Sequence, residues 1–213
     1  EMCIRDSMQM NPTETAILLV GYQNDFFRAD GLLHGAVGEE IQNRNVLPNT
    51  LRLLERALFS GVTVVSTPIA FTDDYRELEN PVGILKTIKE LGAFRKSSPG
   101  SRTVDALQKF SDRIVELPGK QGLCSFSNTG LDSLLQERSI KNVVIAGVVT
   151  SVCIDSTARV AADKGYNVSI LSDCTAGRSA FEQEFYCSEI FPIFSTVSSV
   201  DETLASFANR VAA

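Results

Sequence analysis

The sequence predicts an α/β protein, a three-layer α/β/α sandwich with a mainly parallel, doubly wound sheet. Short apolar runs bounded by glycine or proline alternate along the 213 residues with segments of helical periodicity. That alternation is typical of parallel strands joined by helical crossovers. The strongest runs are apolar at every position, as expected for strands buried on both faces. No apolar run approaches the ~20 residues of a membrane span.

In the first half of the chain, residues 16–20 form a continuous apolar run that predicts a buried strand. Leu51, Leu54 and Leu58 recur with helical spacing, and Gly61 follows as a stop signal. The elements expected here are a strand at 16–20, a helix around 51–58, a strand at 62–66, helices at 84–91 and 104–110, and a strand at 114–117.

In the second half, residues 142–147 are the clearest strand, and the alanines of the next helix are small enough for close packing. The expected elements are a helix at 131–137, a strand at 142–147, a helix at 152–164, a strand at 168–171, a helix at 180–186, a strand at 193–197 and a helix from 201. We expect residues 1–12 to be a disordered or foreign tail and residues 13–213 to be a single domain.

Composition narrows the possible chemistry. Lys and Arg number 20 against 26 Asp and Glu, a net charge of −6, which argues against nucleic acid as a partner. The single histidine, His34, excludes a zinc site built on several imidazoles from this chain. Five cysteines with irregular spacing favour reduced thiols, and the start carries no signal-peptide pattern, so we expect a cytoplasmic protein without membrane partners. No glycine-rich nucleotide motif occurs, so no cofactor is predicted, and the single histidine leads us to predict no metal.

Cys153 stands where the strand at 142–147 gives way to a helix. A thiol at a helix N-terminus is stabilised as thiolate by the helix dipole, and nearby backbone N–H groups can face a developing oxyanion. The alternative is a buried cysteine that packs as a small hydrophobic side chain. Position alone leaves both interpretations open.

Three segments together resemble the cysteine-hydrolase (isochorismatase-like) superfamily. They are VIAGVVTSVCIDSTAR at 144–159, LVGYQNDF at 19–26, and the stretch from Gly119-Lys120 through Ser125-Phe126 to Thr129-Gly-Leu131. They occur in the family's order, and the resemblance extends from about residue 15 to 211. It implies an α/β hydrolase of small molecules that forms homo-oligomers.

Carried over by position, Cys153 matches the family's nucleophile and Lys120 its catalytic lysine. A lysine beside a thiol favours the thiolate and can move protons; the alternative for Lys120 is a solvated lysine after a Pro-Gly turn. The resemblance also implies a cis peptide between Val148 and Val149. That bond would direct the Val149 and Cys153 amides into an oxyanion hole.

The chain departs from the family motif at Gly21, where an aspartate usually stands. Asp25 lies four residues further on and cannot occupy the same place, because an extended chain advances about 3.3 Å per residue. Family members specialised for isochorismate hydrolysis keep that aspartate and can dispense with the cysteine, so this reaction is disfavoured here. The family's metal-bearing nicotinamidases use histidine ligands, which a chain with His34 alone lacks.

The sequence therefore predicts a metal-independent cysteine hydrolase that cleaves a small amide or ureido C–N bond through a Cys153 thioester. The alternative is a catalytically impaired family member that binds a ligand or a partner, because Gly21 replaces the aspartate. Substrate specificity is expected in the segments at 28–45 and 71–99. The residues expected to line the substrate pocket are Gln23, Asn24, Asp25, Phe26, Phe71 and Tyr75. The alternative for Gln23 and Asn24 is capping of local backbone, and the alternative for each aromatic ring is packing in the core.

Overall fold

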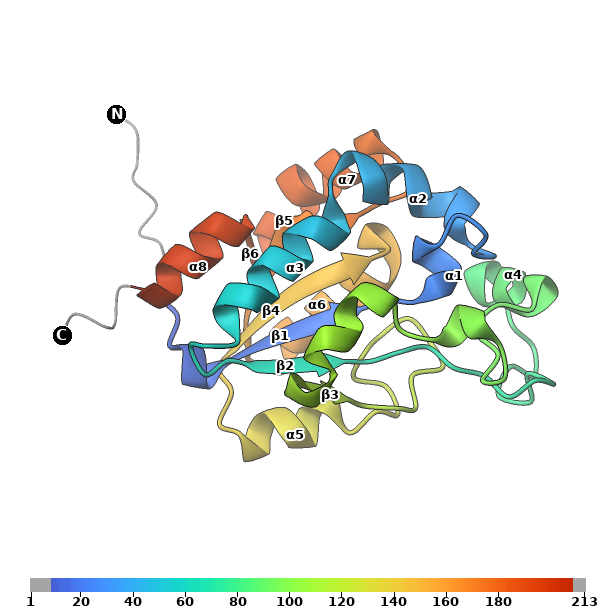
Figure 1. Cartoon of the computed structure of the whole chain (residues 1–213), viewed down its shortest axis with the longest axis horizontal. Coiled ribbons are helices and arrows are strands. Elements are labelled where there is room, and N and C mark those ends of the chain that lie inside the picture. The colour runs from blue at the N-terminus through green and yellow to red at the C-terminus, as the bar shows by residue number, and fades with distance from the viewer. Residues whose placement is uncertain (1–8, 209–213) are drawn as a thin grey trace.

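A parallel sheet forms the centre of the protein in the computed structural model, which describes residues 9–208 (Figure 1). Its strand order is β3-β2-β1-β4-β5-β6, and every neighbouring pair is parallel. The strands are β1 (Thr15–Val20), β2 (Thr63–Ser66), β3 (Ile114–Glu116), β4 (Asn142–Val148), β5 (Asn167–Ala176) and β6 (Thr196–Ser198). The predicted α/β class and doubly wound sheet are confirmed.

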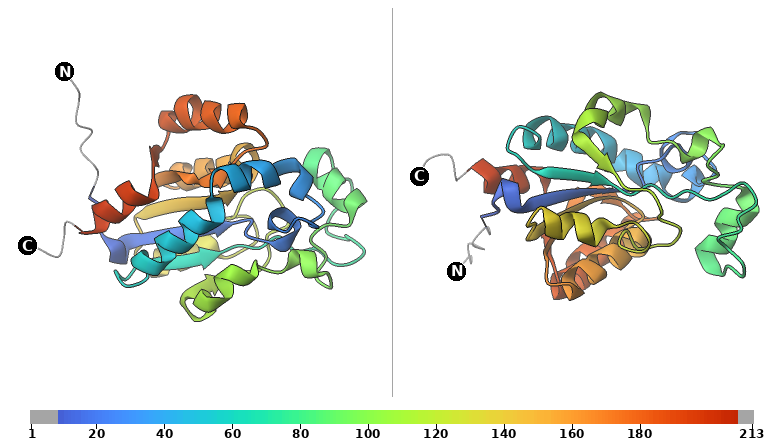
Figure 2. Two further views of the ribbon diagram at one scale, coloured as in Figure 1. Left: turned by 45° about the horizontal axis from the view of Figure 1, so that its top comes forward. Right: turned by 90° about the horizontal axis from the view of Figure 1, so that it is seen from below.

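Helices cover both faces of the sheet. The helices of the described chain are α1 (Asn24–Phe27), α2 (His34–Asn43), α3 (Val46–Ala57), α4 (Gly83–Leu91), α5 (Leu131–Glu137), α6 (Asp155–Asp163), α7 (Ala180–Phe185) and α8 (Val200–Ala208), of which α1 and α4 lie beyond the ends of the strands (Figure 1). Figure 2 shows α3 beside α2 and α8 on one face, and α5 and α6 on the other. Two 3-10 segments, η2 (Pro99–Ser101) and η3 (Asp105–Arg113), lie between α4 and β3.

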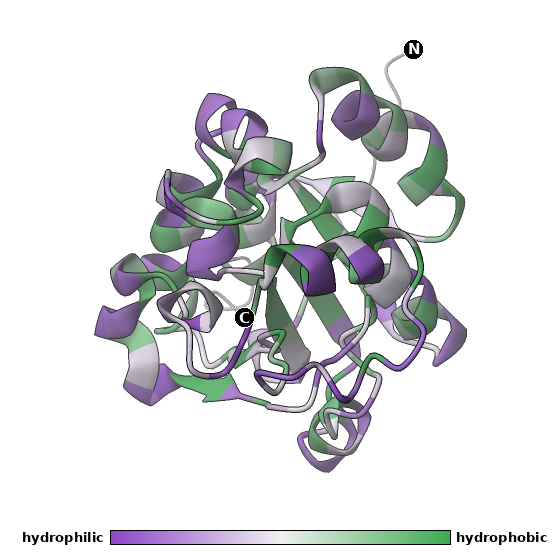
Figure 3. Cartoon of the chain, turned by 90° about the vertical axis from the view of Figure 1, so that its right-hand side faces the viewer, coloured by the Kyte–Doolittle hydropathy of each residue, from purple (hydrophilic) through white to green (hydrophobic). Residues whose placement is uncertain are grey.

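The two central strands are completely buried. Every residue of β1 and of β4 is buried, which explains their continuous apolar runs. Figure 3 looks onto the end of the sheet where the strands finish, with hydrophobic strands at the centre and helices of mixed hydropathy around them. The strand order reverses between β1 and β4, and open α/β sheets bind ligands at the carboxyl ends of the strands at such a point.

Most predicted elements are present with small shifts of their ends, and three differ. The strand expected at 168–171 continues to Ala176, as β5. The segment expected as a helix at 104–110 is the 3-10 helix η3. The strand expected at 193–197 is reduced to β6, because residues 191–193 form the 3-10 turn η6 (Phe191–Ile193) around Pro192. Proline lacks an N–H and is favoured in the first helical turn, where none is needed.

The segment at 28–45, expected as a specificity loop, contains the helix α2. The helix was not predicted because its two glycines lower the helix propensity of the segment. Gly38 has a packing reason: a Cβ there would lie 2.3 Å from the His34 ring, so only glycine leaves room for the imidazole. Val37 and Ile41, four residues apart, are the buried face of the helix.

The structure describes only part of the N-terminal tail that was expected at residues 1–12. Residues 1–8 lie outside the described residues. Residues 9–12 are part of the domain: Met10 is only 8% exposed within the core, and Pro12 is buried in the 3-10 turn η1 (Pro12–Glu14). Within residues 9–208, no helix combines the length and apolarity needed to cross a membrane.

Candidate active site

Lys120 and Cys153 are brought together at the carboxyl end of the sheet. The Nζ atom of Lys120 lies 3.6 Å from the Sγ atom of Cys153, and both residues are buried. Nζ also donates a 2.7 Å hydrogen bond to the Gly122 carbonyl. Within residues 9–208, no carboxylate lies at ion-pair distance from Lys120. The thiol is therefore the only described partner of the lysine that can carry a negative charge.

Cys153 sits in a tight turn directly after β4. Its π-helical turn, η4 (Thr150–Ile154), leads into α6, and the Val148–Val149 peptide is cis, as the resemblance implied. Just before it, Gly147 has φ +126°, and a Cβ there would lie 1.8 Å from the Val20 carbonyl oxygen. Only glycine lets β4 approach β1 this closely, so the sequence fixes where the turn begins.

The segment that carries Lys120 is anchored to the helix of the nucleophile. The Ser125 backbone N–H donates to Thr157 Oγ1 on α6 at 3.0 Å. The Ser125 hydroxyl accepts a 2.8 Å bond from Thr67, just after β2. Ser125 and Thr157 are both fully buried. These bonds hold Lys120 and Cys153 at one relative position, and neither threonine was singled out from the sequence because the contacts join distant segments.

A cavity of about 100 Å³ opens beside Cys153. Apolar side chains from α1, α2, α4 and the nucleophile turn form most of its wall. Its lining residues are Phe26, Leu33, Ala36, Ile69, Ile84, Leu85, Ile88, Gly122, Leu123, Val149, Val152, Cys153 and Arg178. Arg178 is the only charged side chain among them.

Of the six residues expected to line the substrate pocket, only Phe26 lines this cavity. Gln23 is buried and holds two other segments: its Nε2 donates to the Ile69 and Ser101 carbonyls, each at 2.7 Å, and its Oε1 accepts from the Ile69 N–H at 2.9 Å. The Asn24 side chain donates to the Pro99 carbonyl. Both amides bind backbone, and backbone binding was the alternative to the pocket that the sequence left open.

The aromatic pair Phe71 and Tyr75 also lies in the core rather than in the cavity wall. Their rings are 5.5 Å apart, and both residues are at most 3% exposed. The Tyr75 hydroxyl donates to the Ala93 carbonyl at 2.6 Å. Buried tyrosine needs such a partner for its hydroxyl, and the bond links two parts of the 71–99 segment.

The Asp25 carboxylate accepts hydrogen bonds from backbone N–H groups. It accepts a 2.7 Å bond from Phe94 and a longer one from Leu32. Gly100 packs against it so closely that a Cβ there would lie 2.1 Å from Oδ1. Asp25 is thus a buried anchor for three segments, and its described hydrogen bonds do not include Lys120 or Cys153.

Gly21 adopts a conformation that suits glycine. Its φ is +73°, and a Cβ would lie 2.7 Å from the Val148 carbonyl oxygen, beside the cis peptide. L-residues rarely adopt this φ, and an approach of 2.7 Å would force the backbone to shift. The backbone here therefore leaves no unstrained place for an aspartate side chain.

His34 and the other described thiols, Cys124, Cys174 and Cys187, make contacts away from Lys120 and Cys153. His34 Nδ1 lies 2.9 Å from the Phe26 carbonyl oxygen. Burial raises the pKa of Cys174 to about 12 and that of Cys187 to about 11, so both stay protonated near neutral pH. Cys124 Sγ accepts from the Phe126 N–H at 3.4 Å. In the described part of the chain, no three His, Cys, Asp or Glu side chains are grouped as metal ligands.

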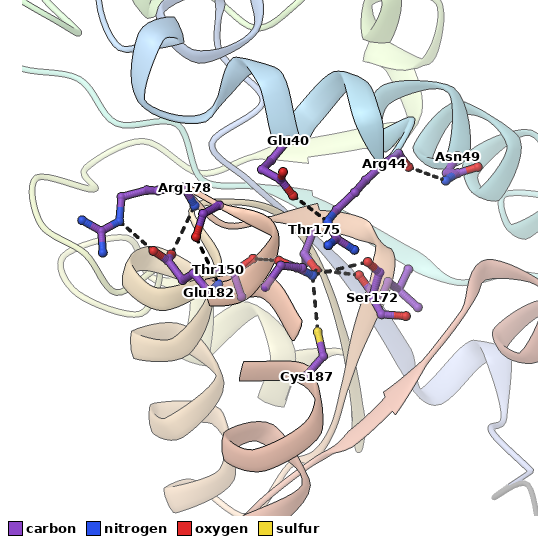
Figure 4. A network of polar contacts seen from close by, with 12 residues as sticks. Glu40, Arg44, Asn49, Thr150, Ser172, Thr175, Arg178, Glu182 and Cys187 are labelled. Carbon is purple, nitrogen blue, oxygen red and sulfur yellow. Dashed lines mark hydrogen bonds and ion pairs between the residues drawn. The ribbon is translucent and has the colours of Figure 1, made fainter. Parts of the chain in front are cut away.

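A buried polar network braces the nucleophile turn from α7 (Figure 4). Gln183 is 1% exposed; its Oε1 accepts from Thr150 at 2.5 Å and its Nε2 donates to Thr175 at 2.9 Å. It also contacts the Cys187 sulfur at 3.3 Å. The network joins β5, α7 and the turn before Cys153. Sequence reasoning missed it because a glutamine on a short helix carries no signal of burial.

Known proteins resemble this chain in sequence and in fold over nearly its whole length. The ureidoacrylate amidohydrolase RutB of Stutzerimonas stutzeri is 28% identical and covers 95% of this chain and 86% of its own. The corresponding protein of Klebsiella pneumoniae is 29% identical, over 92% of this chain and 88% of its own. The crystal structure of a cysteine hydrolase from Pseudomonas syringae pv. phaseolicola has a TM-score of 0.81 at 23% identity, covering 94% and 95% of the two chains.

The family comparison covers more than half of the protein. The family model described as Isochorismatase domain matches residues 15–202, a range that includes β1, the Lys120 segment, the Cys153 turn and the start of the last helix. The match agrees with the resemblance drawn from the three sequence segments. The chain therefore belongs to the Isochorismatase domain family.

Proposed function

We propose that the protein is a metal-independent cysteine hydrolase that cleaves a small amide or ureido C–N bond. The observation that carries the proposal is the 3.6 Å contact between Lys120 Nζ and Cys153 Sγ at the edge of an apolar cavity. The relatives named as ureidoacrylate amidohydrolases support C–N bond hydrolysis of this kind. The Lys120 ammonium stabilises the Cys153 thiolate, because no described carboxylate competes for it.

In the first half-reaction, the Cys153 thiolate attacks the substrate carbonyl carbon and forms a tetrahedral oxyanion. The C–N bond then breaks, the nitrogen leaves with a proton, and a thioester remains on Sγ. For a ureido substrate this intermediate is the corresponding thiocarbamate. Water then attacks the same carbon, Sγ leaves, and the acid is released.

The backbone N–H groups of Val149 and Cys153 are the proposed oxyanion donors. Their positions are supported by the turn itself, in which the Val149 carbonyl accepts from the Val152 and Ile154 N–H groups at 3.0 and 3.2 Å. Backbone donors held in this way need no reorganisation as the negative charge develops.

Lys120 is the proposed donor of the proton that the leaving nitrogen needs. Its Nζ has three hydrogens, of which one is directed to the Gly122 carbonyl and another can face Cys153. In this chain the lysine would do the work that the family shares between a lysine and an aspartate. Gly21 and the engaged Asp25 support this assignment, since neither offers a free carboxylate.

Turnover of a panel of small amides and ureides, measured as release of ammonia or amine, tests the proposal. The wild type is expected to hydrolyse at least one member, while Cys153→Ala loses the activity and keeps the fold by circular dichroism. An active Cys153→Ala variant, or a wild type inert towards the whole panel, contradicts it.

The second candidate is a catalytically impaired member of the family that binds a small ligand or a protein partner. The observation in its favour is that any side chain at position 21 would strain the backbone, so the usual aspartate is not accommodated there. Under this alternative the cavity beside Cys153 still binds ligands, which calorimetry detects, but no member of the panel is hydrolysed.

Location and assembly are proposals as well. The four described cysteines are free, which supports the reducing cytoplasm as the compartment. Homo-oligomerisation is supported by the exposed rings of Phe181 and Phe185, which stack 6.0 Å apart on α7. The molar mass in solution, measured by light scattering, tests the oligomer.

A further inference from the structure

A second cavity, of about 190 Å³, lies between η3 and the strands β1, β2 and β3. Its wall combines apolar side chains with hydroxyls, an amide and one carboxylate. The lining residues are Leu19, Ser66, Thr103, Leu107, Gln108, Ser111, Ile114 and Glu116. None of them lines the cavity beside Cys153, so this cavity is distinct from the candidate active site.

The floor of the second cavity is a row of three side chains. Ser66 is the register partner of Leu19 on β1 and of Glu116 on β3. Partners on neighbouring strands lie about 4.8 Å apart, with their side chains on the same face of the sheet. The next residue, Thr67, faces the opposite side, where its hydroxyl donates to Ser125. An apolar side chain, a hydroxyl and a carboxylate therefore stand side by side on the face that η3 covers.

The Ser66 hydroxyl is buried and yet opens to this cavity. Ser66 is 6% exposed, and its hydrogen bonds within residues 9–208 involve only its backbone, whose carbonyl accepts from the Leu117 N–H. Every enclosed side-chain oxygen and nitrogen of the described chain has a hydrogen-bond partner, so an oxygen without one borders open space. The space that Ser66 borders is the cavity. Its hydroxyl can accept a hydrogen bond from a bound molecule.

Glu116 supplies the only formal charge among the lining residues. Its carboxylate accepts a long bond, of 3.4 Å, from the Thr103 hydroxyl. Within residues 9–208, no lysine or arginine lies at ion-pair distance from it. Two basic side chains nearby in sequence are engaged elsewhere, because Lys109 pairs with Glu55 and Arg113 donates to a backbone carbonyl. The carboxylate therefore keeps an acceptor for a positive group.

We propose that this cavity binds a small primary amine in its protonated form. The ammonium group donates to the Glu116 carboxylate and to the Ser66 hydroxyl, two neighbouring acceptors that suit its three N–H groups. A short apolar chain lies against Leu19, Leu107 and Ile114. Primary amines carry a positive charge near neutral pH, as lysine does. A divalent metal ion is not the expected occupant, because Glu116 is the one carboxylate in the wall.

Titration of the isotope-labelled wild type, followed by its amide NMR signals, both locates binding and measures affinity. The probes are butylamine, 1-butanol and butyltrimethylammonium, which share one chain and differ in charge and in N–H donors. Butylamine is expected to shift the signals of η3 and β3 most. It should bind about five- to tenfold more tightly than 1-butanol, between the effect of an exposed ion pair and that of a hydrogen bond to a charged group.

Two variants separate the two contacts. Glu116→Gln is expected to reduce the affinity for butylamine to that for 1-butanol, because it removes the charge and keeps the size of the side chain. Ser66→Ala is expected to weaken butylamine binding about two- to tenfold, the range of one hydrogen bond. It should leave butyltrimethylammonium, which has no N–H group, unaffected.

The matched control is Glu137→Gln. Glu137 is an exposed glutamate on α5 and lines neither cavity, so this variant should bind all three probes like the wild type. Circular dichroism of each variant shows whether a loss of binding reflects a loss of fold. Glu116 is exposed, so Glu116→Gln keeps the test decisive even where Ser66→Ala does not fold.

Four results overturn the proposal. They are equal affinities of the wild type for butylamine and 1-butanol, an unchanged preference for butylamine in Glu116→Gln, signal shifts confined to the Cys153 turn, and a folded Ser66→Ala variant that binds butylamine like the wild type. The proposal does not depend on the proposed hydrolase activity, because the two cavities share no lining residue.

Discussion

The Nζ atom of Lys120 lies 3.6 Å from the Sγ atom of Cys153, although the two residues come from different segments of the chain, 33 positions apart. Both are buried, and no described carboxylate reaches the lysine. A buried ammonium is costly unless a negative group accompanies it. In the proposed mechanism a Cys153 thiolate meets that requirement, so the one contact would serve both the lysine and the thiol.

Lys120→Met should separate catalysis from stability. Methionine fills a similar volume without a charge, so the free energy of unfolding is expected to stay the same or to rise, as when buried ions are replaced by apolar groups. Hydrolysis is expected to fall by about 10²- to 10⁴-fold, the usual contribution of a positioned proton-transfer group. Urea unfolding and turnover on one preparation give both values. Unchanged turnover would remove Lys120 from the mechanism.

Thiol-selective labelling should single out Cys153. Burial raises the pKa of Cys174 to about 12 and of Cys187 to about 11, so at pH 8 only about one in 10⁴ and one in 10³ of these thiols is ionised. Iodoacetamide is expected to modify Cys153 much faster than either of them, because the thiolate is the nucleophile. Peptide mass spectrometry follows each cysteine separately. Equal rates for Cys153 and Cys174 would contradict a thiolate at Cys153.

Substitution of Gly21 should destabilise the protein whatever the new side chain. Its φ of +73° and the 2.7 Å approach of a Cβ to the Val148 carbonyl predict a loss of about 1–3 kcal/mol for Gly21→Ala, measured by urea unfolding. Gly21→Asp carries the same backbone cost and adds a carboxylate. The ratio of hydrolysis rates between the aspartate and alanine variants therefore isolates the effect of the acid.

That ratio decides between the two candidate functions. If the natural chain hydrolyses its substrate through Lys120 and Cys153 alone, the two Gly21 variants have similar, low activities. A gain of hydrolysis in Gly21→Asp over Gly21→Ala would instead identify the natural chain as an impaired enzyme.

Gln183→Met should loosen the nucleophile turn. The change leaves the buried Thr150 hydroxyl without its acceptor, which costs about 1–3 kcal/mol, whereas the Thr175 hydroxyl keeps its bond to the Leu171 carbonyl. We expect a lower melting temperature and a lower kcat, because the turn precedes Cys153. Gln42→Met, at an exposed glutamine on α2, is the control and should melt like the wild type. A Gln183 variant that also melts like the wild type would exclude a bracing role.

The sequence predicted the features that local pattern controls. The apolar run of β4 and Gly147 near its end lie within one short segment, so the position of Cys153 after the strand could be derived. The pairing with Lys120 came from the resemblance, since nothing in the spacing of the two residues requires them to meet.

Residues whose partners are distant could not be assigned. Asp25 was placed in the substrate pocket because it stands in a motif, yet its carboxylate accepts from Phe94, 69 residues further along the chain. The strand β5 continues past the residue at which prediction ended it, because Asp173 finds partners on other helices. Its carbonyl accepts from Asn49 and its carboxylate from the Val200 N–H. From the sequence, Arg178 is indistinguishable from an ordinary charged surface residue. Only the structure shows that it lines the cavity.

The most direct test of the central claim is to trap the covalent intermediate. The wild type is mixed with a substrate of the amide and ureide panel, quenched in acid within its first turnovers, digested and analysed by mass spectrometry. The account predicts an added acyl or carbamoyl group on the peptide that contains Cys153, absent in Cys153→Ala and lost as hydrolysis finishes. Turnover of a substrate with no adduct on Cys153, or with an adduct on another residue, would contradict it.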